Sequence, residues 1–149
     1  MTTVPTAVNV ARFSAVLETP AAEPALAVGH FAARLAFETD PSDVHADVQK
    51  GIAGLVVVDT RRPESYAKGH VPGAVNLPYR HITAESTARL DRNATYVCYC
   101  AGVGCNASTK GALRLAGLGF KVKEMLNGIE GWREEGYPVA TGNEPGSLN

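Results

Sequence analysis

The chain has 149 residues, of which 45% are hydrophobic and 19% are charged, and its formal net charge at pH 7 is -1. This length allows one domain with a proper core but not two, and the lack of a basic surplus argues against nucleic acid as the main partner. No apolar run approaches the roughly 20 residues that a membrane-spanning helix needs, so no membrane association is expected. The three cysteines lie within eight positions and make no disulfide framework, and the N-terminus lacks the basic and apolar regions of a secretion signal. A cytoplasmic protein is therefore expected.

The N-terminal part of the chain divides into two segments. Residues 1–23 are rich in Ala, Thr, Val and Pro without a sustained period, which predicts a loosely ordered arm. Residues 24–50 predict a helical extension. Apolar residues recur at helical spacing as far as Phe37, and Asp40 followed by Pro41 is typical of the start of a second helix, which ends at Gly51. We expect this extension to pack on the core, where it covers a sheet face or forms a homodimer contact.

Strands and helices alternate through residues 51–140. Strands are predicted at 55–59, 74–77, 95–99 and 120–126, and helices begin at Pro63, near Glu85, at Ala107 and at Ile129. This alternation is typical of an α/β domain with a parallel sheet and helices on both faces. Residues 141–149 form a polar C-terminal tail. Because open sheets of this type bind ligands at the carboxyl ends of their strands, a site is expected there.

Cys100 lies at such an end, directly before a short glycine-bearing loop and a helix. Curled backbone N–H groups and the positive end of the helix dipole stabilise anions, so they favour a thiolate at Cys100 and an oxyanion above it. We interpret Cys100 as a nucleophile; the alternative is a buried structural thiol. Cys98, inside the strand, is predicted to be a core residue. The predicted anion-binding loop consists of Ala101, Gly102, Val103, Gly104, Cys105 and Asn106.

Three segments together resemble the rhodanese-like sulfurtransferase domain of the single-domain type, over about residues 54–138. They are Val58 to Arg61 with the later run Gly69-His70-Val71-Pro72-Gly73-Ala74, the strand and loop at Cys100, and Leu126-Asn127-Gly128-Ile129-Glu130-Gly131-Trp132. The resemblance implies a three-layer fold with a central parallel sheet of about four to five strands. It also implies a thiosulfate sulfurtransferase activity in which Cys100 takes a sulfane sulfur, becomes a persulfide and passes the sulfur on. The expected partners are a small sulfur-containing anion (thiosulfate or a persulfide) and a thiol or cyanide acceptor, with no metal or organic cofactor.

The chain departs from the family pattern at two places. The loop after Cys100 is longer than is usual and contains Cys105, and Asn127 stands where glycine is more common. A curled loop of this length can bring two Cα atoms within the roughly 4.4–6.8 Å that a disulfide requires. Cys105 is then a resolving thiol, a second site for the transferred sulfur, or a small loop residue. Asn at 127 is a mild change, because Asn tolerates the left-handed conformation.

Each of the remaining polar residues has either a role in the site or a role in the structure. The loop contains no Arg or Lys, so Asn106, Ser108, Thr109 and backbone amides are the expected donors, and they suit a persulfide or thiosulfate better than a phosphoester. Asp59 and Arg61 are interpreted as an ion pair that braces the strand end, the alternative being an active-site pair. His70 is interpreted as a turn residue bonded to backbone, the alternative being a proton donor. Trp132 is predicted to anchor the last helix.

The sequence is compatible with two further functions. One is a sulfur-relay or redox-sensing module in which Cys100 and Cys105 form a reversible disulfide. The other is a non-catalytic rhodanese-like interaction domain, which requires an unreactive Cys100.

Overall fold

The computed structural model describes residues 12–149, which form two units, one ending at Ala32 and one spanning Ala33–Asn149. The predicted arm, residues 1–23, lies partly outside the described residues; its described part, 12–23, is exposed. Helix α1 (Pro24–Phe37) forms where the apolar spacing predicts it. None of its residues is buried, and Leu35 and Phe37, in the second unit, are exposed. The expected packing of this helix on the core stays a prediction.

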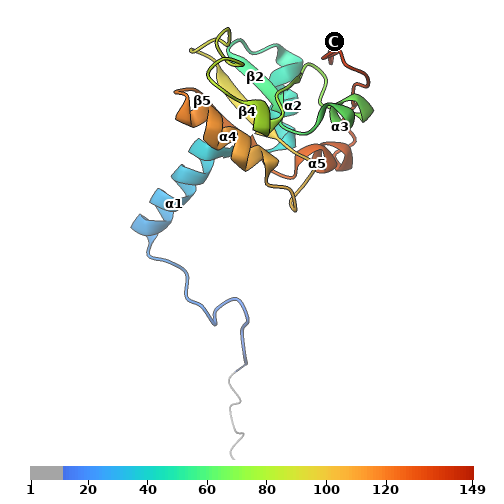
Figure 1. Ribbon diagram of the computed structural model, residues 1–149. Coiled ribbons are helices and arrows are strands. Elements are labelled where there is room, and N and C mark those ends of the chain that lie inside the picture. The colour runs from blue at the N-terminus through green and yellow to red at the C-terminus, as the bar shows by residue number, and fades with distance from the viewer. Residues whose placement is uncertain (1–11) are drawn as a thin grey trace, which may run out of the picture. The chain divides into compact units, whose positions relative to one another are not determined.

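The second unit is built on one five-stranded parallel sheet with the strand order β1-β5-β4-β2-β3 (Figure 1). The strands are β1 (Glu38–Thr39), β2 (Leu55–Asp59), β3 (Val75–Asn76), β4 (Thr95–Tyr99) and β5 (Lys121–Met125). The helices of this unit that follow α1 are α2 (Pro41–Lys50), α3 (Pro63–Lys68), the short 3-10 helix η1 (Tyr79–His81), α4 (Ala107–Gly117) and α5 (Gly128–Glu134). The predicted α/β class with a parallel sheet is confirmed. The short edge strand β1 was not predicted, because two polar residues carry no strand signal.

Side-chain alternation along the strands produces two apolar clusters, one on each face of the sheet. On one face, Val57 and Val97 pack with Val44 of α2 and with the fully buried Trp132 of α5. On the other face, Val58, Tyr96 and Cys98 pack with Leu115 of α4. Helices therefore cover both faces, and the predicted packing roles of Trp132 and Cys98 are confirmed.

Local side-chain chemistry explains where α2 begins and ends. The Asp40 carboxylate accepts a hydrogen bond from the backbone N–H of Asp43 at 2.9 Å, and Pro41 follows this N-cap. Gly51 adopts the left-handed conformation, with φ 67°, and ends the helix. Both boundaries agree with the sequence prediction.

Residues 85–90 form turns, so the helix predicted there is wrong. The hydroxyl of Ser86 donates to the carbonyl oxygen of His81 at 2.7 Å, and the Thr83 hydroxyl accepts from the backbone N–H of Ser86 at 3.1 Å. Ser and Thr side chains that bond to nearby backbone in this way compete with helix formation.

The C-terminal tail is bonded to the domain. The carbonyl oxygen of Pro145 accepts a hydrogen bond from the backbone N–H of Gly73 at 2.8 Å, and His70 and Ala140 form a short antiparallel bridge. In the described part of the chain, no helix combines the length and the apolar content that a membrane crossing requires.

Candidate active site

Cys100 directly follows the last residue of β4, which is the middle strand of the sheet. Its side chain lines a cavity of about 400 Å³ at the carboxyl ends of β4 and β5 and is only 2% exposed. The lining residues are Glu38, Cys100, Gly102, Val103, Cys105, Ser108, Thr109, Glu124, Met125, Leu126, Asn127 and Gly128. The cavity therefore lies at the sheet edge where the sequence predicts a site.

The loop after Cys100 is attached to the start of α5 by main-chain hydrogen bonds. The N–H of Ile129 donates to the carbonyl oxygen of Cys100 at 3.0 Å, and the N–H of Glu130 donates to that of Ala101 at 2.9 Å. Gly128 has φ 54°, and a β-carbon there would overlap the carbonyl oxygen of Cys100. Only glycine fits this position without a shift of the loop or the helix.

Asn127, next to Gly128, is the only described non-glycine residue of residues 12–149 with a positive φ, at 63°. The family pattern more often has glycine here, and the structure confirms that the position requires the left-handed conformation. Asn satisfies this requirement at a modest cost.

Cys100 and Cys105 are joined by a disulfide, with their Cα atoms 6.2 Å apart. The backbone N–H of Cys105 donates to the carbonyl oxygen of Gly102 at 3.1 Å, which closes the loop into a turn. The predicted approach of the two cysteines is confirmed. Their roles in catalysis, and the anion-binding role of residues 101–106, stay predictions.

Cys98 is a different kind of thiol. It is fully buried in the apolar cluster on the α4 face, and burial, with a smaller contribution from the negative charge of Glu124, raises the pKa of the Cys98 thiol to about 12. At neutral pH this side chain is therefore an unreactive core thiol.

Two carboxylates line the cavity, and the sequence analysis did not identify either. Glu124 of β5 accepts hydrogen bonds at 3.0 Å from the hydroxyls of Ser108 and Thr109, both through Oε2. The sequence predicts these hydroxyls to be donors to a bound anion; in the structure both donate to Glu124, and their role toward an anion stays a prediction. The strand register contains the signal, because Glu124 lies directly opposite Cys98 and therefore on the same sheet face.

Asp59 and Arg61 form the predicted ion pair, with Arg61 Nη2 2.7 Å from Asp59 Oδ2. The Asp59 carboxylate is fully buried and also accepts a hydrogen bond from the hydroxyl of Tyr99 at 2.8 Å. Burial, and then the charge of Asp59, raise the pKa of Tyr99 above its ordinary value. Neither Asp59 nor Arg61 is among the described residues that line the cavity, so they support the strand end next to Cys100.

His70 is fully buried, and both ring nitrogens face carbonyl oxygens. Nδ1 lies 2.8 Å from the carbonyl oxygen of Tyr66, and Nε2 lies 3.0 Å from that of Pro145. The ring also stacks on Tyr66, with 3.6 Å between the ring centroids. This bonding to backbone is the structural interpretation that the sequence favoured, and His70 is not among the described lining residues of the cavity.

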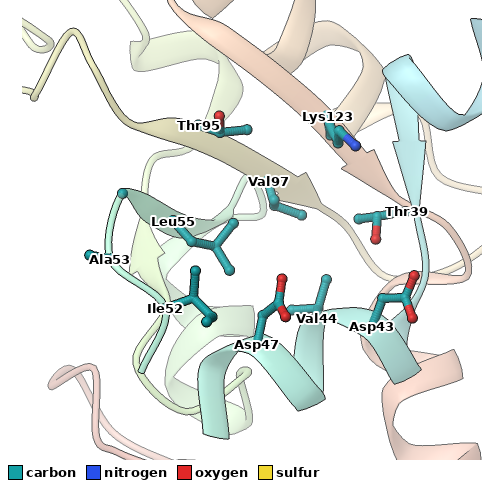
Figure 2. Close-up of a pocket in the computed structure, with 11 residues that line it drawn as sticks. Thr39, Asp43, Val44, Asp47, Ile52, Ala53, Leu55, Thr95, Val97 and Lys123 are labelled. Atoms are coloured by element: carbon teal, nitrogen blue, oxygen red, sulfur yellow. The ribbon is translucent and has the colours of Figure 1, made fainter. Parts of the chain in front are cut away.

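A second cavity, of about 330 Å³, lies between α2 and the sheet, on the face away from α4 (Figure 2). Figure 2 shows Val44 and Asp47 of α2 pointing toward Leu55, at the start of β2, and Val97, in the middle of β4. Its described lining includes no cysteine or histidine. Across residues 12–149, no three His, Cys, Asp or Glu side chains are grouped to hold a metal ion.

Comparison with known proteins places these features in a family. A model of the rhodanese-like domain matches residues 40–135, which include α2, assigned above to the predicted extension. The thiosulfate sulfurtransferase GlpE of Pseudomonas entomophila is 41% identical over 91 residues, which are 59% of this chain and 78% of that protein. The HTH-type transcriptional regulator Rv0324 of Mycobacterium tuberculosis is 37% identical over 89 residues, which are 59% of this chain but only 38% of the regulator.

The solved structures agree with this result. The crystal structure of the BH2092 protein from Bacillus halodurans superposes with a TM-score of 0.79 at 40% identity, over 81% of this chain and 88% of that one. The matched family segment contains four of the five strands, Cys100 and its loop, and it covers more than half of the chain. The chain therefore belongs to the rhodanese-like domain family.

Proposed function

We propose that the chain is a sulfurtransferase in which Cys100 carries a sulfane sulfur as a persulfide. The observation that carries the proposal is the place of Cys100: it directly follows the middle strand of a rhodanese-like sheet and lines a cavity there. The similarity to a protein named as a thiosulfate sulfurtransferase supports the same reaction class.

The reaction requires Cys100 as a free thiolate. The disulfide with Cys105 is therefore first opened by a thiol reductant, which supplies two electrons and two protons. The Cys100 thiolate then attacks the outer sulfur of the donor and forms a new S–S bond, and the donor's own S–S bond breaks. Thiosulfate leaves as sulfite, and a persulfide donor leaves as a thiolate. An acceptor thiol or cyanide takes the sulfur in the second half-reaction. Backbone amides of residues 101–106 are proposed to stabilise the developing charge.

The disulfide favours a second candidate, in which Cys105 resolves the persulfide. The Cys105 thiolate attacks Sγ of Cys100, the Cys100–Cys105 disulfide forms, and the outer sulfur leaves as hydrosulfide. The two cysteines are oxidised and the transferred sulfur is reduced, so the electrons balance. A module that works in this way is a sulfur relay or redox sensor, and it needs a reductant for each turnover.

The experiment compares wild type, Cys100→Ser and Cys105→Ser after reduction and removal of the reductant. Each protein receives thiosulfate or a low-molecular-weight persulfide. Thiocyanate formation from cyanide, sulfide release and protein mass are then measured. Loss of transfer only in Cys100→Ser supports the transferase. Sulfide release that depends on Cys105 supports the relay. A wild-type protein that gains no sulfur from any donor, and whose Cys100 resists alkylation, refutes both and leaves a non-catalytic interaction domain.

A further inference from the structure

The cavity at Cys100 has an acidic lining. Glu38 and Glu124 contribute carboxylates, and the described lining residues include no Lys or Arg. A third carboxylate, that of Glu130, lies against Gly102 in the loop, because a β-carbon at position 102 would overlap it. A site for a small dianion would instead be expected to contain cationic side chains.

The two carboxylates of the cavity are neighbours in the sheet. Glu38 of β1 lies directly opposite Glu124 of β5, and Glu124 lies opposite Cys98 of β4. Like charges directly opposite each other on adjacent strands destabilise a sheet. The stability of the sheet therefore does not explain why Glu38 and Glu124 face each other. Attraction of a cationic ligand to the cavity does explain it.

The neighbours of these carboxylates offset little of their negative charge. Arg34 pairs with Glu38 at 3.0 Å, but the side chain of Arg34 is 52% exposed, and exposed ion pairs of this kind are weak. Ser108 and Thr109 bring hydroxyls, which are uncharged, to Glu124. Lys110 is directed elsewhere, with Nζ 5.2 Å from the centroid of the Tyr79 ring.

We infer, on the basis of the function proposed above, that the sulfur donor of this site is a cysteine persulfide in a Lys- or Arg-rich stretch of a polypeptide, and that Glu124 determines this preference over thiosulfate. Thiosulfate brings two negative charges to the acidic lining, and its product, sulfite, is also an anion. A basic polypeptide instead brings positive charge beside the reacting sulfur. Val103, which lines the same cavity and is 85% exposed, offers an apolar contact for such a chain.

The transfer itself needs no oxidant. In the reduced protein the Cys100 thiolate attacks the outer sulfur of the donor persulfide, and the S–S bond of the donor breaks. The donor cysteine leaves as a thiolate and takes a proton from water. The basic residues of the donor are not consumed.

The test uses two synthetic peptide persulfides that differ only in the residues flanking the cysteine, Lys in one and Glu in the other, with thiosulfate as the third donor. Wild type, Glu124→Gln and the control Glu134→Gln are reduced, freed of reductant and exposed to each donor. Glu134 is an exposed residue at the end of α5 and is not among the described lining residues. The rate of sulfur addition to Cys100 is followed by mass spectrometry.

Wild type and Glu134→Gln are expected to accept sulfur from the Lys peptide about tenfold faster than from the Glu peptide, and Glu124→Gln to reduce this ratio severalfold. Glutamine keeps an oxygen that accepts the hydroxyls of Ser108 and Thr109. Raising the salt concentration gives a second readout on the unmodified protein: screening slows the reaction with the Lys peptide and speeds those with the Glu peptide and thiosulfate.

Equal rates with the two peptides, a preference for thiosulfate, or rates that do not respond to salt would overturn the inference while leaving the sulfurtransferase intact. A ratio unchanged in Glu124→Gln would remove Glu124 from the explanation. If Cys100 gains sulfur from none of the three donors, it is the proposed function itself that fails.

Discussion

Replacement of Gly128 by alanine tests the attachment of the Cys100 loop to α5. Gly128 has φ 54°, a conformation that costs a residue with a side chain about 1–2 kcal/mol. The new β-carbon would also overlap the carbonyl oxygen of Cys100, so the loop and the helix must separate. This separation weakens the two hydrogen bonds from Ile129 and Glu130 to the loop, at about 0.5–1.5 kcal/mol each. The expected loss in the free energy of unfolding is about 2–5 kcal/mol.

Gly136→Ala is the matched control. Gly136 also has a positive φ, 78°, but a β-carbon there meets no atom within 4 Å. Only the conformational cost of about 1–2 kcal/mol is expected. Urea unfolding of both variants measures the difference, and the alkylation rate of Cys100 in the reduced proteins shows whether the loop has moved. Equal destabilisation of the two variants, with unchanged alkylation, would refute the argument that this glycine holds the loop in place.

Three other outcomes follow from the packing. Asp59→Asn leaves Arg61 without its buried counter-charge and is expected to cost about 3–5 kcal/mol in urea unfolding; a loss below that of Tyr99→Phe would contradict the ion-pair argument. Burial raises the pKa of Cys98 to about 12, so the fold favours the protonated thiol. The resulting stabilisation is complete below the ordinary thiol pKa and is lost as the pH rises toward 12. The difference in the free energy of unfolding between wild type and Cys98→Ala should therefore shrink above about pH 9. A difference that stays constant with pH would refute this argument. Trp132→Ala removes a fully buried side chain whose Nε1 donates to the carbonyl oxygen of Pro138 at 2.8 Å, and should cost about 3–5 kcal/mol by thermal or urea unfolding; a loss under 1 kcal/mol would show that the last helix is not anchored by this residue.

The sequence contains strong signals for the middle of the sheet and weak ones for its edge. The β-branched run at 55–59 and the strand at 95–99 are apolar on both faces, as strands covered by helices must be, and both form as predicted. The strand Glu38–Thr39 has no such pattern, because an edge strand of two residues buries little. It forms through its pairing with β5, a tertiary contact that local sequence does not encode.

The candidate site shows the same division. The place of Cys100 and the approach of Cys105 follow from a strand, a loop of known length and a helix, all of which are local in sequence. The carboxylate of Glu124 comes to the cavity from a strand that follows α4, and its distance from Cys100 depends on strand register. Without that register, Ser108 and Thr109 look like free donors, whereas in the structure both are bonded to Glu124.

The hydroxyl of Tyr99 donates a hydrogen bond to the Asp59 carboxylate and accepts one from the backbone N–H of Val71 at 3.0 Å. Both bonds lie on the side of the sheet away from α4. These bonds hold Tyr99, the residue just before Cys100, while the N–H groups of Ile129 and Glu130 hold the carbonyl oxygens of Cys100 and Ala101. Insertions or deletions after Ala101, within residues 102–106, should change which molecules reach the Cys100 sulfur without displacing it. The length of this one loop can therefore vary among proteins of this architecture while the framework that holds the residue at position 100 stays the same.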